Sequence, residues 1–350
     1  MSYRRRPPLV ELTICRSKEF LREPEAVFWV FAFPVLLAVA LGFAFREKAP
    51  DRIPVGVLTQ GGDSGSAAST LSALSGSPIL LPRGYDGTAG REALRTGKIS
   101  LLVEPGPPAV FHFDASRPDS RIARLEANEA LQKAAGRRET VAIDSRQITD
   151  KGARYIDFLI PGLLGMNLMG TGIWSIAFSV TVSRNRRILK RMIATPMRKS
   201  QFLLAQILGR LGFLLPEIVI LVGFGWGMFG VAVRGSILLL LAVCLLGAMT
   251  FCGFGLLCGS RVSTIEGASG LANIIMLPMW ILSGTFFSSA RFPDAVQPVI
   301  KALPLTALNE SLRAIINEGA GLSAILPQLG IVAAWGAVTF FVALKIFRWK

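Results

Sequence analysis

The stretch RNRRILKRMIATPMRK, at residues 184–199, decides how this chain is organised. It contains seven lysines and arginines and no acidic residue, and it lies between two long apolar runs. Short basic loops beside membrane spans remain in the cytoplasm. The stretch therefore predicts a membrane protein and indicates which side of the membrane each neighbouring segment occupies.

Within this stretch, apolar and basic residues take opposite faces of a predicted helix. The apolar face consists of Ile188, Leu189, Met192 and Ile193, and the basic face of Arg187, Lys190 and Arg191. Pro196 ends the helix, because the residue before a proline is displaced from the α region. We expect a short amphipathic helix in the cytoplasm. It either lies on anionic lipid as a topology anchor or docks onto a cytoplasmic partner.

The composition is that of a polytopic membrane protein with one soluble insert. Of the 350 residues, 51% are hydrophobic and 17% are charged, with a mean hydropathy of +0.50, whereas about a quarter of the residues in soluble domains are charged. The net charge is +15. Because the basic residues gather beside membrane spans, topology explains them, and nucleic acid is not expected as a partner.

The chemical groups in the sequence give no catalytic, cofactor or metal site. A zinc site of the usual kind requires several cysteine or histidine ligands. The single histidine, His112, has no cysteine near it in the sequence. None of the four cysteines lies in the soluble insert, so no disulfide framework is expected. The motif G-x-x-x-x-G-K-[ST] is absent from the sequence, so the chain has no P-loop for ATP. We expect a protein that is not an enzyme.

Six apolar runs are each long enough to cross a membrane once. They cover residues 26–45, 156–182, 202–229, 236–259, 267–287 and 324–347. The predicted fold is mainly α, with six transmembrane helices and both termini in the cytoplasm. Residues 1–25 predict an amphipathic connecting helix on the cytoplasmic surface, and residues 288–323 predict an external helical segment. A cleaved signal peptide is disfavoured, because the first apolar run continues past the A-x-A pattern at residues 38–40.

Residues 46–154 form an insert of soluble composition between the first two apolar runs. Strands are predicted at residues 53–59, 99–103 and 110–113, and helices at residues 67–74, 86–96 and 121–135. Gly97 is the expected cap of the second of these helices. Because the insert follows a span that begins in the cytoplasm, we expect a small α/β extracytoplasmic domain, large enough for a modest core of its own.

Three polar residues inside the apolar runs are candidates for a polar pathway through the membrane: Asn167, Glu217 and Asn273. A carboxylate in hydrocarbon is costly, so Glu217 should face the helix bundle, form a pair or be protonated. The two asparagines can equally hold helices together through hydrogen bonds. Arg210 lies two turns before Glu217 and would reach it only through water or a bend.

Two motifs resemble the membrane subunits of ABC-2-type transporters, the permeases of ABC exporters. The first, LKRMIATPMRKSQFLLAQILGRL at residues 189–211, is similar to the loop after the second span of that family. The second, PMWILSGTFFSSARFPDAVQPVIKALPLTALNESLRAIINEG at residues 278–319, is similar to the end of the fifth span and the external helix of the family. Both motifs occur in the family's order, and the resemblance covers residues 155–350.

The resemblance implies an ATP-driven exporter that moves an amphipathic substrate, such as a drug, antibiotic, lipid or glycolipid, out of the cytoplasm or inner leaflet. It implies a homodimer or a pseudo-symmetric heterodimer in the bacterial plasma (inner) membrane, in contact with lipids. ATP and Mg²⁺ would be bound by a separate cytoplasmic ABC ATPase. Residues 184–199 would be the coupling helix. Its contacts with the ATPase would be made by Arg187, Ile188, Leu189, Arg191, Met192, Ile193, Thr195 and Pro196.

Two other classes stay open. One is an ATP-independent transporter or channel, which would predict inverted repeats and more intramembrane charge. The other is a membrane-anchored sensor that binds a ligand with its external domain and uses the spans to relay the signal.

Overall fold

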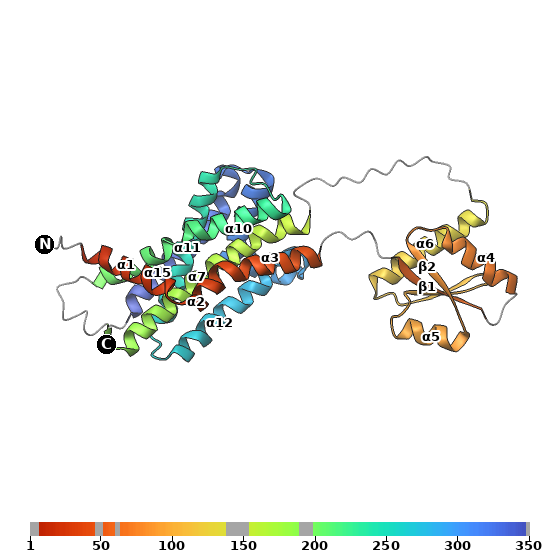
Figure 1. Cartoon of the computed structure of the whole chain (residues 1–350), viewed down its shortest axis with the longest axis horizontal. Helices are drawn as coiled ribbons and strands as arrows, with labels where there is room; N and C mark the ends of the chain where they lie inside the picture. Colours follow the sequence, from red (N-terminus) through yellow and green to blue (C-terminus); the bar gives the residue numbers. More distant parts are fainter. Residues whose placement is uncertain (1–6, 46–51, 60–63, 138–153, 189–198, 348–350) are drawn as a thin grey trace. The chain divides into compact units, whose positions relative to one another are not determined.

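The computed structural model describes residues 7–45, 52–59, 64–137, 154–188 and 199–347. The chain divides into two compact units. One, the helical unit, comprises Met1–Arg46 and Ile148–Lys350, and the other, the α/β unit, comprises Glu47–Gln147. Figure 1 shows the helices of the first unit and the sheet of the second.

Six helices of the helical unit, within the residues described, are long and apolar enough to cross a membrane. They are Pro24–Ala44, Tyr155–Asn185, Gln201–Phe229, Ile237–Gly259, Ile265–Leu282 and Leu322–Ile346. This confirms the prediction of a mainly helical, polytopic membrane protein with six candidate spans. Each helix begins and ends within five residues of the predicted apolar run.

The first span contains an irregular turn and follows a separate helix. Helix α1 (Pro8–Leu21) packs against α9 (Lys199–Leu211), which begins the third span. The first span itself consists of α2 (Pro24–Val27), the π-helical turn η1 (Phe28–Ala32) and α3 (Phe33–Ala44). A helix thus precedes the first span within residues 1–25, and part of its surface contacts α9.

The third span is broken into α9 and α10 (Leu214–Phe229). Gly212 and Phe213 form a turn between them. Pro216 favours this break, because it has no N–H to donate to Gly212 and its ring would clash with the carbonyl of Gly212 in a continuous helix. The span predicted at residues 202–229 is present, and the turn divides it.

Helix α7 (Tyr155–Asn185) is the central helix of the helical unit. It packs against α3, α10, α11 (Ile237–Gly259), α12 (Ile265–Leu282) and α14 (Pro304–Arg313). Small residues allow close packing between membrane helices. A Cβ atom added at Gly172 of α7 would lie 2.8 Å from the Cβ of Phe251 in α11. Only a glycine permits this approach of the two backbones.

The fifth span ends at Leu282, five residues before the end of the predicted apolar run. Gly284 then has a φ of +69°, a conformation that favours glycine and that a continuing helix does not contain. Short helices follow: η2 (Ser289–Arg291), η3 (Asp294–Val296), α13 (Gln297–Ala302), α14 and η4 (Ala314–Glu318). Helix α15 (Leu322–Ile346) is the last span.

The α/β unit has a four-stranded sheet in the order β2-β1-β3-β4. Strands β1 (Ile53–Leu58), β2 (Leu80–Tyr85) and β3 (Leu101–Glu104) are parallel, and β4 (Val110–Phe113) pairs antiparallel with β3. Helices α4 (Ser64–Ser75) and α6 (Pro118–Ala134) pack on one face and α5 (Gly87–Arg95) on the other (Figure 1). The described residues of the insert thus form one mixed sheet with helices on both faces.

Strand β2 was not predicted from the sequence. It reads LLPRGY, with Pro82 and Gly84 at its third and fifth positions. Proline cannot donate to a neighbouring strand and is confined mainly to sheet edges or strand starts, and glycine weakens a strand. Strand β2 lies at the edge and pairs only with β1, so Pro82 is tolerated there. The central strand β1 contains Pro54, at its second position, and Gly56.

Candidate functional site: polar contacts along the central helix

A buried ion pair lies where the third span bends. The Nη2 atom of Arg210, near the end of α9, lies 2.6 Å from Oε2 of Glu217, in the first turn of α10. Their side chains are 4% and 0% exposed. Seven residues along a straight helix span about 10 Å, so the break at Gly212 brings the two charges together. Of the two routes expected for Arg210 to reach Glu217, the structure contains the bend.

Thr171 connects this ion pair to the central helix. Its hydroxyl oxygen accepts a hydrogen bond from Nη2 of Arg210 and lies 3.3 Å from Oε1 of Glu217. The same oxygen lies 2.6 Å from the backbone oxygen of Asn167, one turn earlier on α7. A hydroxyl has one proton to donate, so Thr171 donates either to its own helix or to Glu217. We refer to Asn167, Thr171, Arg210 and Glu217 as the polar network.

Asn167 extends the polar network to the first span. Its Nδ2 donates to the backbone oxygen of Val30 at 3.0 Å, inside the π-helical turn η1. Turns of this kind often occur at functional sites. Asn273, by contrast, is exposed on α12, and in the described part of the chain no hydrogen bond joins it to the polar network. The structure therefore brings together two of the three predicted pathway residues, Asn167 and Glu217.

The guanidinium of Arg210 has further hydrogen-bonding capacity. Its Nε and Nη1 atoms are buried and have no hydrogen-bond partner among the described residues. A buried donor left without a partner costs about 1–3 kcal/mol, and more when it is charged. These two donors are therefore favourable contacts for a polar group that enters the helix bundle.

A second set of polar contacts joins α1, α9 and α7. The Nε of Arg16 donates to Oε1 of Gln206 at 2.7 Å, and the hydroxyl of Ser179 donates to the same oxygen at 2.5 Å. A Cβ atom added at Gly209 would lie 2.9 Å from the Cβ of Arg16, so the glycine permits the close approach of α1. These contacts fix α1 to the helix that directly follows the predicted coupling segment.

The carboxyl end of α7 leads into that segment. Arg184 donates to the backbone oxygens of Val262 and Ser260, at 2.5 and 2.8 Å, and so holds α7 against the turn between α11 and α12. Of the predicted coupling residues, the structure places Arg187, with a φ of +55°, and half-buried Ile188 just past the end of α7. The others lie outside the described residues: Leu189, Arg191, Met192, Ile193, Thr195 and Pro196.

The amino end of α7 contacts the short helices that follow the fifth span. Arg313 of α14 donates from Nη2 to the backbone oxygen of Gly284, and its guanidinium carbon lies 3.6 Å from the centre of the Phe158 ring. The hydroxyl of Tyr155 donates to the backbone oxygen of Phe286 at 2.9 Å. Two parts of the second sequence motif, around Gly284 and Arg313, thus meet at the first turns of α7.

These contacts can support recognition and movement. Among the residues described, no group of three His, Cys, Asp or Glu side chains could hold a metal ion. The contacts occur at both ends and in the middle of α7, which is a single helix of 31 residues. A displacement of one end of this helix therefore reaches the polar network and the contacts at the other end.

Sequence reasoning missed Thr171, Arg16 and Gln206 as members of these contacts. One signal for Thr171 was present, because it lies four residues after Asn167 and so on the same face of a helix. For Arg16 and Gln206 there was none, since they are 190 residues apart and no local pattern connects α1 with α9.

Comparison with known proteins shows which chains this one resembles. A family model described as ABC-2 family transporter protein matches residues 25–345. The chain is 23% identical over 340 residues to the probable multidrug ABC transporter permease YbhS of Escherichia coli (strain K12), an alignment that covers 88% of each chain. It is 28% identical over 177 residues to the linearmycin resistance permease protein LnrN of Bacillus subtilis (strain 168).

A third relative matches over a shorter length. The chain is 29% identical over 122 residues to the inner membrane transport permease YhhJ of Escherichia coli (strain K12), covering 35% of this chain and 33% of that protein. The match to LnrN covers 51% of this chain and 42% of that protein. The chain thus matches YbhS over most of its length, but YhhJ and LnrN over less than half of theirs.

Proposed function

This chain belongs to the ABC-2 family of transporter proteins, and from that premise we propose that it is the membrane subunit of an ATP-driven exporter. Members of the family are transmembrane subunits rather than enzymes, and generally work with a cytoplasmic ABC ATPase. In this proposal, ATP and Mg²⁺ bind to a separate ATPase subunit, because the chain has no P-loop. The spans lie in the bacterial inner membrane, with both termini in the cytoplasm and the α/β unit outside.

The observation that carries the proposal is the path of α7. One continuous helix contacts the polar network at its middle and leads directly into the predicted coupling segment, residues 184–199. Force applied to that segment would therefore reach α7 through the two turn residues Arg186 and Arg187. Arg184 joins the same end of α7 to the turn between α11 and α12, so these spans move with it.

We propose that the coupling helix lies within residues 184–199, between the turn at Arg186 and Arg187 that ends α7 and the start of α9 at Lys199. An amphipathic helix inserted into a groove is a common way to bind a partner, and a small apolar cluster dominates the binding energy of such contacts. Leu189 and Met192, which belong to the predicted apolar face, would make the central contact with the ATPase. The basic residues would surround this contact or meet lipid headgroups.

The polar network is the proposed switch inside the membrane. Because Thr171 has one proton and two acceptors, a shift of α7 relative to α10 changes which acceptor it serves. The free donors of Arg210 offer a polar contact within an apolar bundle. This combination suits an amphipathic cargo, such as a drug, antibiotic, lipid or glycolipid. The names of YbhS and LnrN, a multidrug permease and a linearmycin resistance permease, are in keeping with that class.

A second copy of the chain is part of the proposal. Asn273 is a polar side chain on the exposed face of a membrane-length helix. Polar side chains inside a membrane rarely face lipid, and they commonly form hydrogen bonds with another helix. A homodimer that covers this face of α12 would supply such a partner.

Co-purification with the ATPase tests the proposal. Leu189→Asp and Met192→Asp should abolish recovery of the ABC ATPase while the chain still inserts into the membrane, because each places a charge in the apolar contact. The matched controls, Arg187→Gln and Arg191→Gln, change the opposite face and should reduce recovery much less. If the Asp variants retain the ATPase at wild-type stoichiometry, residues 184–199 are only a topology anchor and the proposed coupling is wrong.

A further inference from the structure

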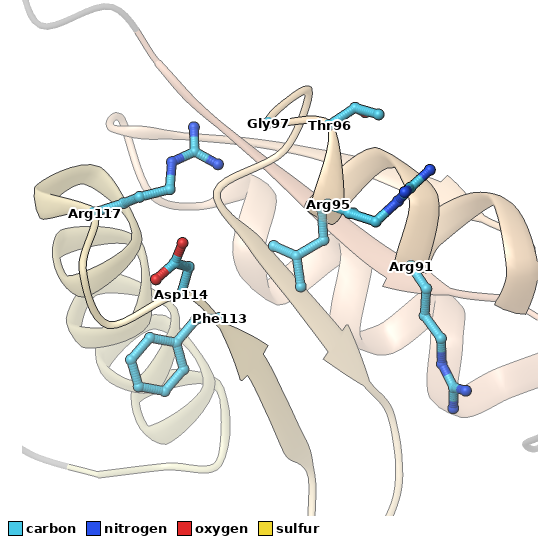
Figure 2. A pocket seen from close by; sticks show the side chains of 8 residues that line it. Arg91, Arg95, Thr96, Gly97, Phe113, Asp114 and Arg117 are labelled. Carbon is cyan, nitrogen blue, oxygen red and sulfur yellow. The ribbon is translucent and has the colours of Figure 1, made fainter.

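The α/β unit contains a hollow of about 590 Å³ that the exporter proposal does not use. It is bounded by the last residues of α5, the turn that follows, the end of β4 and the residues before α6. Its lining residues are Arg91, Leu94, Arg95, Thr96, Gly97, Phe113, Asp114 and Arg117 (Figure 2). We refer to it as the arginine pocket.

The charge of the arginine pocket is strongly positive. Three guanidinium groups and one carboxylate line it. The carboxylate of Asp114 accepts hydrogen bonds from the backbone nitrogen and hydroxyl of Ser116, at 2.9 and 2.7 Å. These bonds, together with the smaller effect of the Arg117 charge, hold the pKa of Asp114 below its ordinary value, so it is ionised at neutral pH. The lining therefore has a net charge of +2.

The three arginines of the pocket experience two repulsive interactions. Arg91 and Arg95 are four residues apart on α5, where like charges repel, although Arg95 lies in the last turn, where the helix dipole favours a cation. Arg117 is the N-cap residue of α6, at the positive end of the helix dipole, where a cation is disfavoured. No ion pair with a carboxylate is found for these three arginines in the part of the chain described. An anion in the arginine pocket would relieve both repulsions.

The local backbone makes room for one of these guanidinium groups. Gly97, which follows the C-cap residue Thr96 of α5, has a φ of +76°, and a Cβ atom there would lie 3.1 Å from Nη2 of Arg117. Figure 2 shows Arg117 and Asp114 on one side of the hollow and Arg91 and Arg95, from α5, on the other. Arg91 and Arg95 are exposed, and exposed side chains change rotamer within nanoseconds, so both are able to turn toward a ligand.

The lining also has an apolar part. Leu94 and Phe113 are half-buried, and the guanidinium of Arg124 lies over the Phe113 ring, 5.2 Å from its centre. Arginine binds phosphate through paired N–H donors in a fixed planar geometry. A phosphomonoester carries a charge of about −1.5 to −2 at pH 7, which matches the net charge of the lining.

We propose that the arginine pocket binds the phosphomonoester headgroup of an amphiphile, with the adjoining apolar atoms of the ligand on Leu94 and Phe113. This proposal concerns binding by the α/β unit and holds whether or not the chain exports its cargo. Inorganic phosphate offers the same anionic group without the apolar part. The two sources are therefore distinguished by comparing free phosphate with a soluble phospholipid.

The test is isothermal titration calorimetry on the full chain in phosphatidylcholine nanodiscs, with empty nanodiscs as the blank. The probes are dihexanoyl phosphatidic acid, inorganic phosphate and dihexanoyl phosphatidylcholine. We expect saturable binding of phosphatidic acid, weaker binding of phosphate, and none of the zwitterionic lipid. Arg95→Gln and Arg117→Gln should each raise the dissociation constant for phosphatidic acid about tenfold, which corresponds to loss of one charge-assisted hydrogen bond.

Two control variants keep the test independent of folding. Arg83→Gln removes an exposed arginine of β2 that does not line the pocket, and binding should be unchanged. Asp114→Asn keeps the acceptor for Ser116 but raises the net charge of the lining, so it should tighten binding several-fold. Absence of saturable phosphatidic acid binding, equal affinity for phosphate and phosphatidic acid, or affinities unchanged in the pocket variants would each overturn the proposal.

Discussion

The ion pair between Arg210 and Glu217 gives the most quantitative prediction. Glu217→Gln leaves the Arg210 guanidinium as a buried charge without its counter-ion, and both side chains are almost fully buried. Removing one partner of such a pair costs about 3–5 kcal/mol. We expect Glu217→Gln to lower the free energy of unfolding by that amount. The double variant Arg210→Met/Glu217→Gln, which removes both charges, should recover most of it. Chemical unfolding of the full chain in nanodiscs, in a double-mutant cycle, measures both values.

A matched control separates this effect from the loss of any carboxylate. Glu266 is exposed in the first turn of α12, where an acidic side chain contributes about 0.3–1 kcal/mol through the helix dipole. Glu266→Gln should therefore change stability by no more than that. If Glu217→Gln is as stable as the wild type and the coupling energy with Arg210 is near zero, the ion pair does not stabilise the protein and the reasoning fails. The single variant Glu217→Gln and the double variant Arg210→Met/Glu217→Gln should also couple ATP hydrolysis poorly to transport. In both, the hydroxyl of Thr171 loses the Glu217 carboxylate as an acceptor.

Three further outcomes are expected. In a chain without native cysteines, a cysteine introduced in α5 should react with an impermeant maleimide in intact cells, and one introduced in residues 184–199 should not; the reverse would contradict the proposed topology. Gly172→Leu should cost at least about 1–3 kcal/mol in thermal or chemical unfolding, because it overpacks the contact with Phe251. The control is Gly223→Leu, where an added Cβ has no atom within 4 Å. Equal losses of stability in the two variants would refute the close contact between Gly172 and Phe251. Gln206→Leu should speed hydrogen exchange in α1, and unchanged exchange would show that Arg16 does not fix α1 to α9.

The six spans were predictable because the thickness of a bilayer sets the length of an apolar run. The same reasoning could not locate the break in the third span, since hydropathy does not register the missing N–H of Pro216, and Pro161 and Pro278 lie inside helices that continue. The polar network depends on that break, because only the break brings the Arg210 guanidinium to the Glu217 carboxylate. Hydropathy also did not distinguish the two asparagines. Helix α7 is surrounded by other helices, so Asn167 is buried, whereas α12 leaves Asn273 exposed.

In the α/β unit, the elements predicted correctly from the sequence were those with clear local patterns. Three strands and three helices followed from apolar periodicity, and Gly97 follows α5 in the left-handed conformation expected of a capping glycine. The edge strand β2 was missed, because Pro82, Arg83 and Gly84 leave it only a short apolar run, whereas β1 has four aliphatic residues around Pro54 and Gly56. The arginine pocket was not predictable, since it joins residues of α5 with residues between β4 and α6 that only the folded sheet brings together.

Transport itself tests the central claim most directly. Inverted membrane vesicles that contain the chain and its ABC ATPase are supplied with ATP, and uptake of a panel of fluorescent amphipathic dyes and lipids is recorded. An ATPase variant unable to hydrolyse ATP is the control. The account predicts uptake that requires both ATP hydrolysis and the chain. Uptake that persists with the inactive ATPase, or without any ATPase, and that follows an ion gradient instead would contradict it.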